Sequence, residues 1–231
     1  MQLTPDIKDY ELIDSGDFEK LERFGAYVLR RPEPQAIWHK SLAESEWRRI
    51  ADASFLRDER NDERGEWRLS PKMPSRWNIR YDYRDMHLSM RLGLTSFKHV
   101  GIFPEQAANW NFIYDECRVL AGDSGGAKVL NLFAYTGGAT VACASAGASV
   151  CHVDSARNMV ERARENMELS GLSERPVRYI VDDCKKFVRR EINRGRRYDA
   201  LIMDPPSYGR GPNGELWKIE EDLYDFVELC S

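Results

Sequence analysis

The chain has 231 residues, enough for one large domain or for a small domain followed by a medium one. Apolar residues make up 42% of it and charged residues 31%, as is ordinary for a globular protein. The formal net charge of −4 excludes a global electrostatic attraction to nucleic acid. A surface that binds nucleic acid would therefore have to be a local patch.

The cysteines and histidines show no pattern of a disulfide framework or a metal site. The five cysteines are scattered, odd in number and free of C-x-x-C spacing, and the four histidines show no ligand spacing. No run approaches about 18 apolar residues, and the N-terminus lacks the basic and apolar regions of a signal peptide. We expect a soluble cytoplasmic protein with no membrane segment and no metal.

The first hundred residues are predicted to be rich in β-structure. Residues 10–14, 21–24 and 26–30 are predicted to be short strands separated by turns. Residues 41–57 are predicted to form a helix, although the apolar spacing is imperfect. Residues 58–72 are rich in Arg, Asp and Glu and are predicted to be a solvated loop.

Apolar and polar residues alternate with period two over residues 77–84 and 88–95. The alternation predicts two strands with one apolar and one wet face, in a small, largely antiparallel sheet. This sheet could be a module of its own or extend the sheet that follows. Basic and aromatic residues interleave over residues 60–98, which suits RNA contact through phosphates and stacked bases. The residues of this predicted patch are Arg64, Trp67, Arg68, Lys72, Arg76, Trp77, Arg80, Arg84 and Arg91. The equally weighted alternative is that the aromatic residues are core and the arginines are solvated.

Strands and helices alternate in the second half of the chain. A helix is predicted to start at Pro104, and residues 128–133 are predicted to be a buried strand followed by a helix. Further strand–helix pairs are expected at residues 148–154 and 155–170, 177–181 and 185–194, and 198–203 and 216–231. The fold class is therefore α/β, a Rossmann-like, mainly parallel sheet with helices on both faces. We divide the chain into a β-rich region, residues 1–100, and an α/β domain, residues 101–231.

Four consecutive strands end in polar or glycine-rich features. These are the loop 135–138, Asp154, the pair Asp182 and Asp183, and the segment 204–206. Ligands of open parallel sheets bind beyond the carboxyl ends of the strands. The four features are therefore predicted to converge on one nucleotide-like ligand.

The strand and loop of residues 128–138 favour one nucleotide over another. Asp154, at the next strand end, could accept both ribose hydroxyls of NAD or of S-adenosylmethionine. The dinucleotide fingerprint G-x-G-x-x-G is absent, since only Gly137 and Gly138 remain after bulky residues. A pyrophosphate needs the close backbone approach that three spaced glycines allow, whereas a sulfonium with an amino-acid tail does not. The favoured cofactor is S-adenosylmethionine.

The segment Asp204-Pro205-Pro206-Ser207-Tyr208 is a second discriminating feature. Two prolines after a strand fix an extended loop with few N–H donors of its own. Such a loop can present carbonyls and Asp204 to an acceptor base, with Tyr208 available to stack on it. The alternative is a stiff exit from the strand.

Residues 129–208 resemble the class I S-adenosylmethionine-dependent methyltransferases related to the bacterial 23S ribosomal RNA methyltransferases that modify cytosine C5 or guanine N7. V-L-N-L-F-A-Y-T-G-G is similar to the first motif of that group, D-D-C to its third and D-P-P-S-Y to its fourth. Residues 101–110, G-I-F-P-E-Q-A-A-N-W, resemble a segment that the group places next to the cofactor. The resemblance implies methylation of a base in ribosomal RNA, with RNA as partner.

The resemblance also implies roles for individual residues. The methionine moiety would contact the loop after the first strand, which consists of Phe133, Ala134, Tyr135, Thr136, Gly137 and Gly138. Asp154 with Ser155 would hold the ribose, Asp183 with Cys184 the adenine edge, and Phe103 and Gln106 would close over the cofactor. Asp204, Pro205 and Pro206 would face the methyl group and its target, and with Tyr208 they form the predicted catalytic set.

The sequence departs from the family pattern in two ways. Asn131 stands where many class I enzymes carry an acid, so the methionine ammonium would be held differently. The chain also stops inside the helix after the fourth strand, so we expect the methyltransferase domain to be incomplete at its C-terminus.

Two further hypotheses stay open for the function. The acceptor could be a small molecule or a protein side chain, or the chain could be a non-catalytic nucleic-acid-binding module. A cytosine C5 mechanism would need a cysteine nucleophile. We expect Cys230 to be a core residue instead, and Cys184 to line the adenine pocket.

Overall fold

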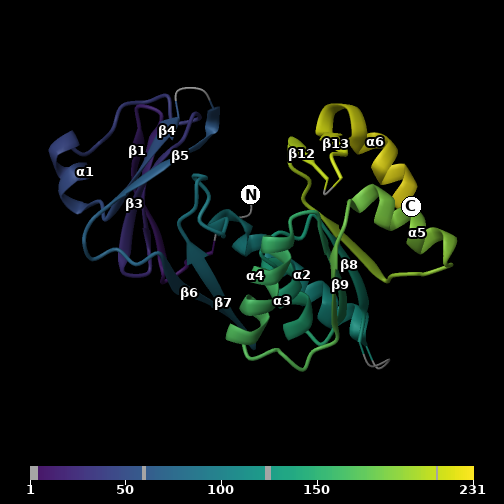
Figure 1. The fold of residues 1–231 in the computed structure, drawn as a ribbon. Helices are drawn as coiled ribbons and strands as arrows, with labels where there is room; N and C mark the ends of the chain where they lie inside the picture. The colour runs from purple at the N-terminus through teal and green to yellow at the C-terminus, as the bar shows by residue number, and fades with distance from the viewer. Residues whose placement is uncertain (1–4, 59–60, 123–125, 212) are drawn as a thin grey trace. The chain divides into compact units, whose positions relative to one another are not determined.

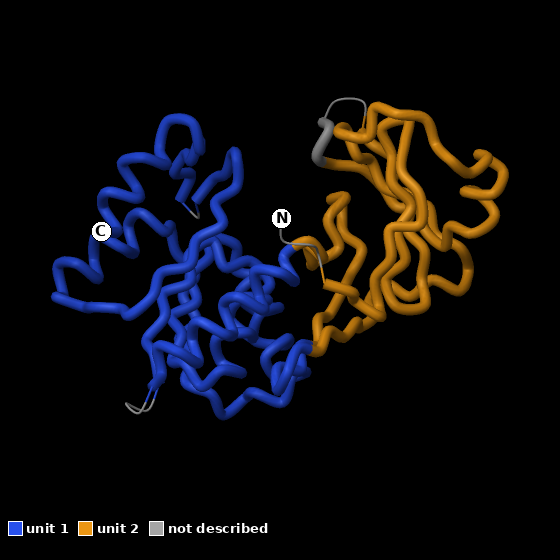
Figure 2. The backbone as a smooth tube through the Cα atoms, turned by 180° about the vertical axis from the view of Figure 1, so that it is seen from behind, with its two compact units in different colours: residues 1–3, 83–88, 106–231 blue, residues 4–82, 89–105 orange. Residues whose placement is uncertain are grey.

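The computed structural model describes residues 5–58, 61–122, 126–211 and 213–231. The chain divides into two compact units, drawn in two colours in Figure 2. Unit 1 consists of residues 1–3, 83–88 and 106–231, and unit 2 of residues 4–82 and 89–105. The predicted domain border at residue 100 stays a prediction.

Unit 2 contains a five-stranded sheet with the order β1-β2-β3-β4-β5. Its strands are β1 (Tyr10–Gly16), β2 (Glu19–Phe24), β3 (Tyr27–Pro32), β4 (Ala53–Asp58) and β5 (Asn61–Leu69). Neighbouring strands are antiparallel except β3 and β4, which are parallel and are joined through helix α1 (Glu44–Ile50). The predicted β-rich N-terminal region is confirmed.

Two local predictions in unit 2 are wrong. The helix predicted over residues 41–57 ends at Ile50, and the predicted solvated loop contains β5, whose Trp67 pairs with Phe55 of β4. The charges that suggested a loop lie on a strand at the edge of the sheet, where Arg64 and Arg68 are exposed. Charged residues suit such an edge because they discourage pairing with another chain. Residues 59 and 60 of that loop lie outside the described residues.

Strands β6 (Arg76–Tyr83) and β7 (Met86–Gly93) form a separate two-stranded sheet. The predicted period of two is confirmed, with Trp77, Ile79 and Tyr81 buried between exposed residues of β6. The Nε1 atom of Trp77 donates a hydrogen bond to the Phe24 carbonyl oxygen at 3.1 Å. These rings are core, so stacking of bases on Trp77 and Tyr81 is ruled out, while Arg80 between them is exposed.

Unit 1 is built on a four-stranded parallel sheet with the order β10-β9-β8-β11. Its strands are β8 (Lys128–Leu132), β9 (Ser149–Asp154), β10 (Val177–Val181) and β11 (Ala200–Met203). Helices α3 (Gly138–Ser145) and α4 (Arg157–Leu169) lie on one face and α5 (Cys184–Asn193) on the other, as Figure 1 shows. The predicted Rossmann-like sheet with helices on both faces is confirmed.

Helices and a hairpin flank the parallel sheet of unit 1. A 3-10 turn (Pro104–Gln106) leads into helix α2 (Ala107–Ala121), which packs on α3. Strands β12 (Tyr208–Arg210) and β13 (Leu216–Lys218) form a hairpin, so the helix predicted from residue 216 is α6 (Ile219–Cys230) instead. Among the described residues, no helix is both long and apolar enough to cross a membrane.

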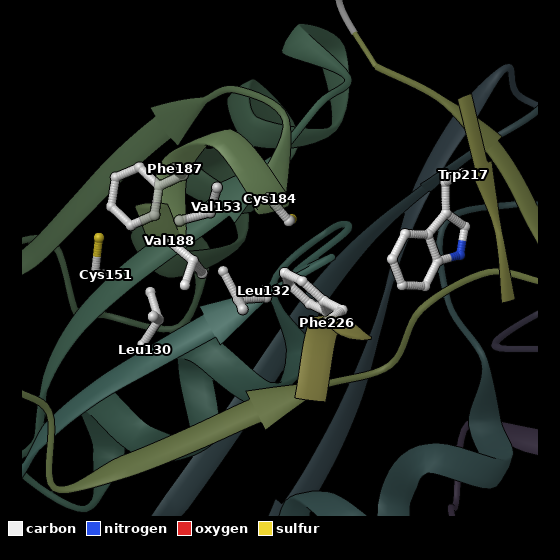
Figure 3. Close-up of a cluster of buried hydrophobic side chains, with 9 residues drawn as sticks. All are labelled: Leu130, Leu132, Cys151, Val153, Cys184, Phe187, Val188, Trp217 and Phe226. Atoms are coloured by element: carbon white, nitrogen blue, oxygen red, sulfur yellow. The ribbon is translucent and has the colours of Figure 1, made fainter. Parts of the chain in front are cut away.

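A hydrophobic cluster lies beneath the carboxyl ends of the strands in unit 1. Figure 3 shows its members, which are Leu130, Leu132, Cys151, Val153, Cys184, Phe187, Val188, Trp217 and Phe226. They come from β8, β9, α5, β13 and α6, so five elements share this core. Phe133, the first residue after β8, packs against the same cluster. The loop that carries the predicted site therefore rests on buried apolar side chains.

Candidate cofactor and acceptor site

The loop between β8 and α3 has an unusual backbone. Phe133, Tyr135 and Gly137 have φ angles of 53°, 49° and 88°, in the left-handed region. Side chains in that region cost about 1 kcal/mol or more each, so a non-glycine residue stays there only when its surroundings hold it. The ring of Phe133 lies 5.0 Å from that of Trp217 and 5.8 Å from that of Phe226, which hold it in place.

Backbone hydrogen bonds tie this loop to the neighbouring strand. The N–H of Ala134 donates to the Val153 carbonyl at 3.1 Å, and the N–H of Tyr135 donates to Asp154 Oδ2 at 2.9 Å. The N–H of Ala156 donates to Asp154 Oδ1 at 2.8 Å. Burial raises the pKa of Asp154, and these N–H groups partly offset that rise. A carboxylate has about four acceptor positions, so Asp154 keeps capacity for ribose hydroxyls.

Ser155 does not cap the following helix, α4. The residue before α4 is Ala156, and no side chain caps that end of the helix. The Asp154 carboxylate accepts a hydrogen bond from the Ala156 N–H instead, so it satisfies a backbone donor just before the helix. The predicted ribose contact of Ser155 stays a prediction.

The two glycines of the loop allow the helices to pack closely. A Cβ atom on Gly137 would lie 2.9 Å from the Cβ of Ala163 in α4. A Cβ atom on Gly138 would lie 2.8 Å from three atoms of the Trp110 indole in α2. Thr136, between them and the strand, is buried, and its carbonyl accepts a hydrogen bond from Asn166 at 2.8 Å. Helix packing therefore requires these glycines, whatever ligand the loop holds.

Asn131 belongs to a buried polar chain behind the loop. Its Nδ2 donates to Thr140 Oγ1 at 3.0 Å, and that hydroxyl lies 2.9 Å from His152 Nδ1. Burial lowers the pKa of His152 to about 3, so the imidazole is neutral at physiological pH. Through these contacts Asn131 is linked to Thr140 in α3 and His152 in β9. Nothing in the spacing of the histidines indicated this arrangement.

The end of β10 supplies a helix start. Asp183 caps α5 by accepting a hydrogen bond from the Lys186 N–H at 2.9 Å. The Cys184 thiol is buried, accepts from the Phe133 N–H at 3.4 Å, and has its pKa raised to about 12 by burial. The first N–H groups of an α-helix have no partner within the helix. The N–H groups of Cys184 and Lys185, the first two residues of α5, suit the acceptor nitrogens of an adenine edge.

The end of β11 meets the start of α2. Asp204 Oδ2 accepts a hydrogen bond from Gln106 Nε2 at 3.0 Å, and Gln106 Oε1 accepts one from Asn109 Nδ2 at 2.8 Å. The structure therefore joins two predicted site residues that are 98 positions apart. Asn109 was not among the predicted residues, although it lies within the segment 101–110.

The segment after Asp204 is exposed and anchored at one point. The Pro206 carbonyl accepts a hydrogen bond from Trp217 Nε1 at 2.7 Å, while the side chain of Tyr208 is 53% exposed. Phe103 belongs to unit 2, where its ring lies 5.2 Å from that of His99. The roles predicted for Pro205, Pro206, Tyr208 and Phe103 stay predictions.

Comparison with known protein families identifies the chain. Residues 17–217 match the profile of the family described as S-adenosylmethionine-dependent methyltransferase. The chain belongs to this family. Its cofactor is S-adenosylmethionine, as the strand ends predicted, and the residues around the β8–α3 loop fit such a ligand without a pyrophosphate site.

Curated relatives of this family member are named as ribosomal RNA methyltransferases. The chain is 31% identical over 134 residues to the ribosomal RNA large subunit methyltransferase K/L of Shewanella frigidimarina, covering 57% of the chain and 18% of the relative. It is 37% identical over 82 residues to the ribosomal RNA large subunit methyltransferase I of Klebsiella pneumoniae, covering 35% and 20%. The chain thus spans about a fifth of the length of these relatives.

Solved structures of methyltransferases share the fold. The SAM-dependent methyltransferase from Agrobacterium tumefaciens is 39% identical, with a TM-score of 0.87 over 97% of this chain and 69% of that one. SMU.776, a methyltransferase complexed with SAH, is 20% identical with a TM-score of 0.71, over 96% and 57% of the two chains. The class I methyltransferase fold is confirmed.

Proposed function

We propose that this protein transfers a methyl group from S-adenosylmethionine to a base in ribosomal RNA, in the cytoplasm. One observation carries the proposal: the left-handed loop, Asp154 and the Gln106–Asp204 pair all lie at the carboxyl edge of one parallel sheet. That edge is where open α/β sheets bind their ligands. The names of the relatives support ribosomal RNA as the substrate class.

The proposed contacts with the cofactor follow the geometry of the strand ends. Residues 133–138 would hold the methionine moiety and Asp154 the ribose, while the first turn of α5 would bind the adenine edge. S-adenosylmethionine supplies a sulfonium methyl group that is already reactive toward nucleophiles. The protein's contribution is therefore to bind and orient, with proximity supplying most of the rate.

The proposed acceptor side is the segment after β11. Asp204, held by Gln106, would accept a hydrogen bond from the target base, and Pro205 and Pro206 would keep the segment extended. The exposed Tyr208 would stack on that base. Burial raises the pKa of both Cys184 and Cys230, which disfavours the thiolate. These two thiols therefore do not support a cysteine nucleophile.

Two measurements test the proposal. Titration calorimetry with S-adenosylmethionine should show binding, and tritiated methyl groups should pass to ribosomal RNA from a strain that lacks the modification. Absence of cofactor binding by a folded sample would refute the enzyme and leave a nucleic-acid-binding module. Cofactor binding without transfer to RNA would point to a small-molecule or protein acceptor.

Asp154→Ala tests the ribose contact. Removal of the carboxylate deletes the predicted acceptor of both hydroxyls, so the Kd for S-adenosylmethionine should rise at least about tenfold, which corresponds to about 1.4 kcal/mol. Asp199→Ala is the matched control, because Asp199 accepts a hydrogen bond from the Lys128 N–H at the other edge of the same sheet. An unchanged Kd in Asp154→Ala would remove the ribose assignment.

A further inference from the structure

Unit 1 carries a strongly basic segment in a chain of negative net charge. Residues 185–197 contain seven Lys or Arg residues and one acid, Glu191. We call residues 185–197 the basic segment. It comprises nearly all of α5 and the loop that leads to β11. The sequence had indicated a basic patch in residues 60–98, where the structure buries the rings of Trp77 and Tyr81.

Part of this charge is neutralised inside unit 1 and part is not. Ion pairs join Lys185 to Asp222, Lys186 to Glu215, Arg190 to Asp182 and Arg194 to Glu191. Arg189, Arg196 and Arg197 are exposed, and their side chains have no hydrogen bond or ion pair with any described residue. These three guanidinium groups are free to contact an anion.

The basic segment ends at a groove of about 760 Å³. The charged residues that line it are Lys128, Arg178, Arg196, Arg197 and Glu191. Glu191 is buried and already accepts hydrogen bonds from Tyr198 at 2.6 Å and from Arg194 at 3.0 Å. Burial raises the pKa of Glu191, but these two hydrogen bonds and the positive charges of Arg178 and Arg194 together more than offset that rise, and the net shift is downward. The groove is therefore cationic toward solvent.

The groove lies at the opposite edge of the sheet from the candidate cofactor site. It includes Lys128, Ser149 and Val177, the first residues of three parallel strands. Helix α5 connects the two edges, because its cap Asp183 follows β10 and its last turn leads into the groove. Ten helical residues span about 15 Å. Arg189 is exposed along this path.

We propose that the groove and the exposed side of the basic segment bind the phosphate backbone of the RNA substrate. Arginine donors suit phosphate oxygens, and contacts of this kind position a nucleic acid without reading its sequence. An RNA strand that binds in the groove and along α5 would reach the carboxyl edge of the sheet, where Asp204 lies. This inference rests on the proposed function and names the surface that would hold its substrate.

The test removes the three unpaired charges and measures RNA affinity against salt. The variant is R189Q/R196Q/R197Q, and the probe is a single-stranded RNA oligonucleotide of about 20 nucleotides followed by fluorescence anisotropy. The association constant falls as salt rises, and each phosphate contact on a single strand adds about 0.7 to the steepness of log K against log salt. Loss of three contacts should therefore make this dependence shallower by about 2. The affinity at low salt should fall at least about tenfold.

The control variant is R23Q/R48Q/R49Q, which removes the same charge from unit 2. Those three arginines have ion-pair partners in Glu11, Glu44 and Glu46. The control should keep the wild-type slope. Equal losses in both variants would show a net-charge effect and overturn the proposed surface, as would an unchanged slope in R189Q/R196Q/R197Q.

Two further measurements separate this inference from the proposed function. Calorimetry should give R189Q/R196Q/R197Q the wild-type Kd for S-adenosylmethionine, because none of the three arginines is among the residues proposed to contact the cofactor. Wild-type methyl transfer to RNA with an unchanged slope would refute the surface and leave the function standing. Binding to vesicles of anionic lipid but not to RNA would overturn RNA as the occupant.

Discussion

His152 shows how one buried side chain links folding to pH. Its imidazole is fully buried, with Nδ1 beside the Thr140 hydroxyl, and its Nε2 has no hydrogen-bond partner among the described residues. A proton on this ring would have to be buried without a compensating charge, which is costly. The neutral ring is therefore part of the folded state, directly behind the glycines of the candidate cofactor loop.

The lowered pKa of His152 predicts acid sensitivity. The pKa is about 3 in the folded protein and about 6.5 in the unfolded chain, so the stabilisation is complete above about pH 6.5 and is lost as the pH falls toward 3. At about pH 5 the loss should be roughly 2 kcal/mol. His152→Asn should remove most of this pH dependence, as measured by urea unfolding at about pH 7.5 and pH 5.

The exposed His39 provides the control for that experiment. Its side chain is 98% exposed, so His39→Asn should leave the pH dependence of unfolding unchanged. Because the comparison is between two pH values for each variant, a general loss of stability in His152→Asn does not affect it. Wild-type and His152→Asn curves with the same pH dependence would contradict the prediction.

At the scale of the element, the turn from β8 into α3 depends on Gly137. Alanine at this position would destabilise the fold by about 1 kcal/mol through its left-handed φ of 88°. The clash with Ala163 in α4 would cost about 1–3 kcal/mol more. Gly171 is a matched control, because its φ is 72° and a Cβ atom there would meet nothing within 4 Å. Gly137→Ala should therefore lower the free energy of unfolding by at least about 1 kcal/mol more than Gly171→Ala.

The two alanine variants separate backbone strain from close packing. Chemical denaturation of both, with the cofactor absent, measures the difference. If Gly137→Ala cost no more than Gly171→Ala, the packing of α3 against α4 would not explain the glycine. A ligand contact would then be the better reason for its presence in the loop.

At the scale of the whole molecule, the core of unit 1 joins distant parts of the chain. Phe226 of α6 is fully buried and touches Phe133, so the last helix supports the left-handed loop. Phe226→Ala should lower the free energy of unfolding by about 3–5 kcal/mol through the cavity that it leaves. Tyr224, in the same helix, is 80% exposed, and Tyr224→Ala should change it by less than about 0.5 kcal/mol.

Urea unfolding followed by tryptophan fluorescence suits this comparison, because Trp217 lies 5.5 Å from Phe226. The Phe226→Ala variant should also bind S-adenosylmethionine more weakly, since Phe133 loses one of its two aromatic packing partners. Similar stabilities for Phe226→Ala and Tyr224→Ala would show that α6 does not support the loop.

The sequence alone predicted the centre of unit 1 because its two middle strands, β8 and β9, are buried on both faces. Such strands are short apolar runs that end in polar residues, and the strands at residues 128–132 and 149–154 follow this rule. The same reasoning failed for residues 53–58 and 61–69, where paired strands are rich in charge. Their pairing partners, and not their own patterns, decide that they are strands.

The chemical character of the site was readable from the sequence, since each strand end displays its own polar residues. Only the tertiary structure placed Gln106 beside Asp204 and enclosed Asn131 with Thr140 and His152. It also decided which arginines are free, because Arg190 meets Asp182 whereas Arg196 and Arg197 face a groove. A polar residue's identity is local, but its partner and its exposure depend on segments far away in the chain.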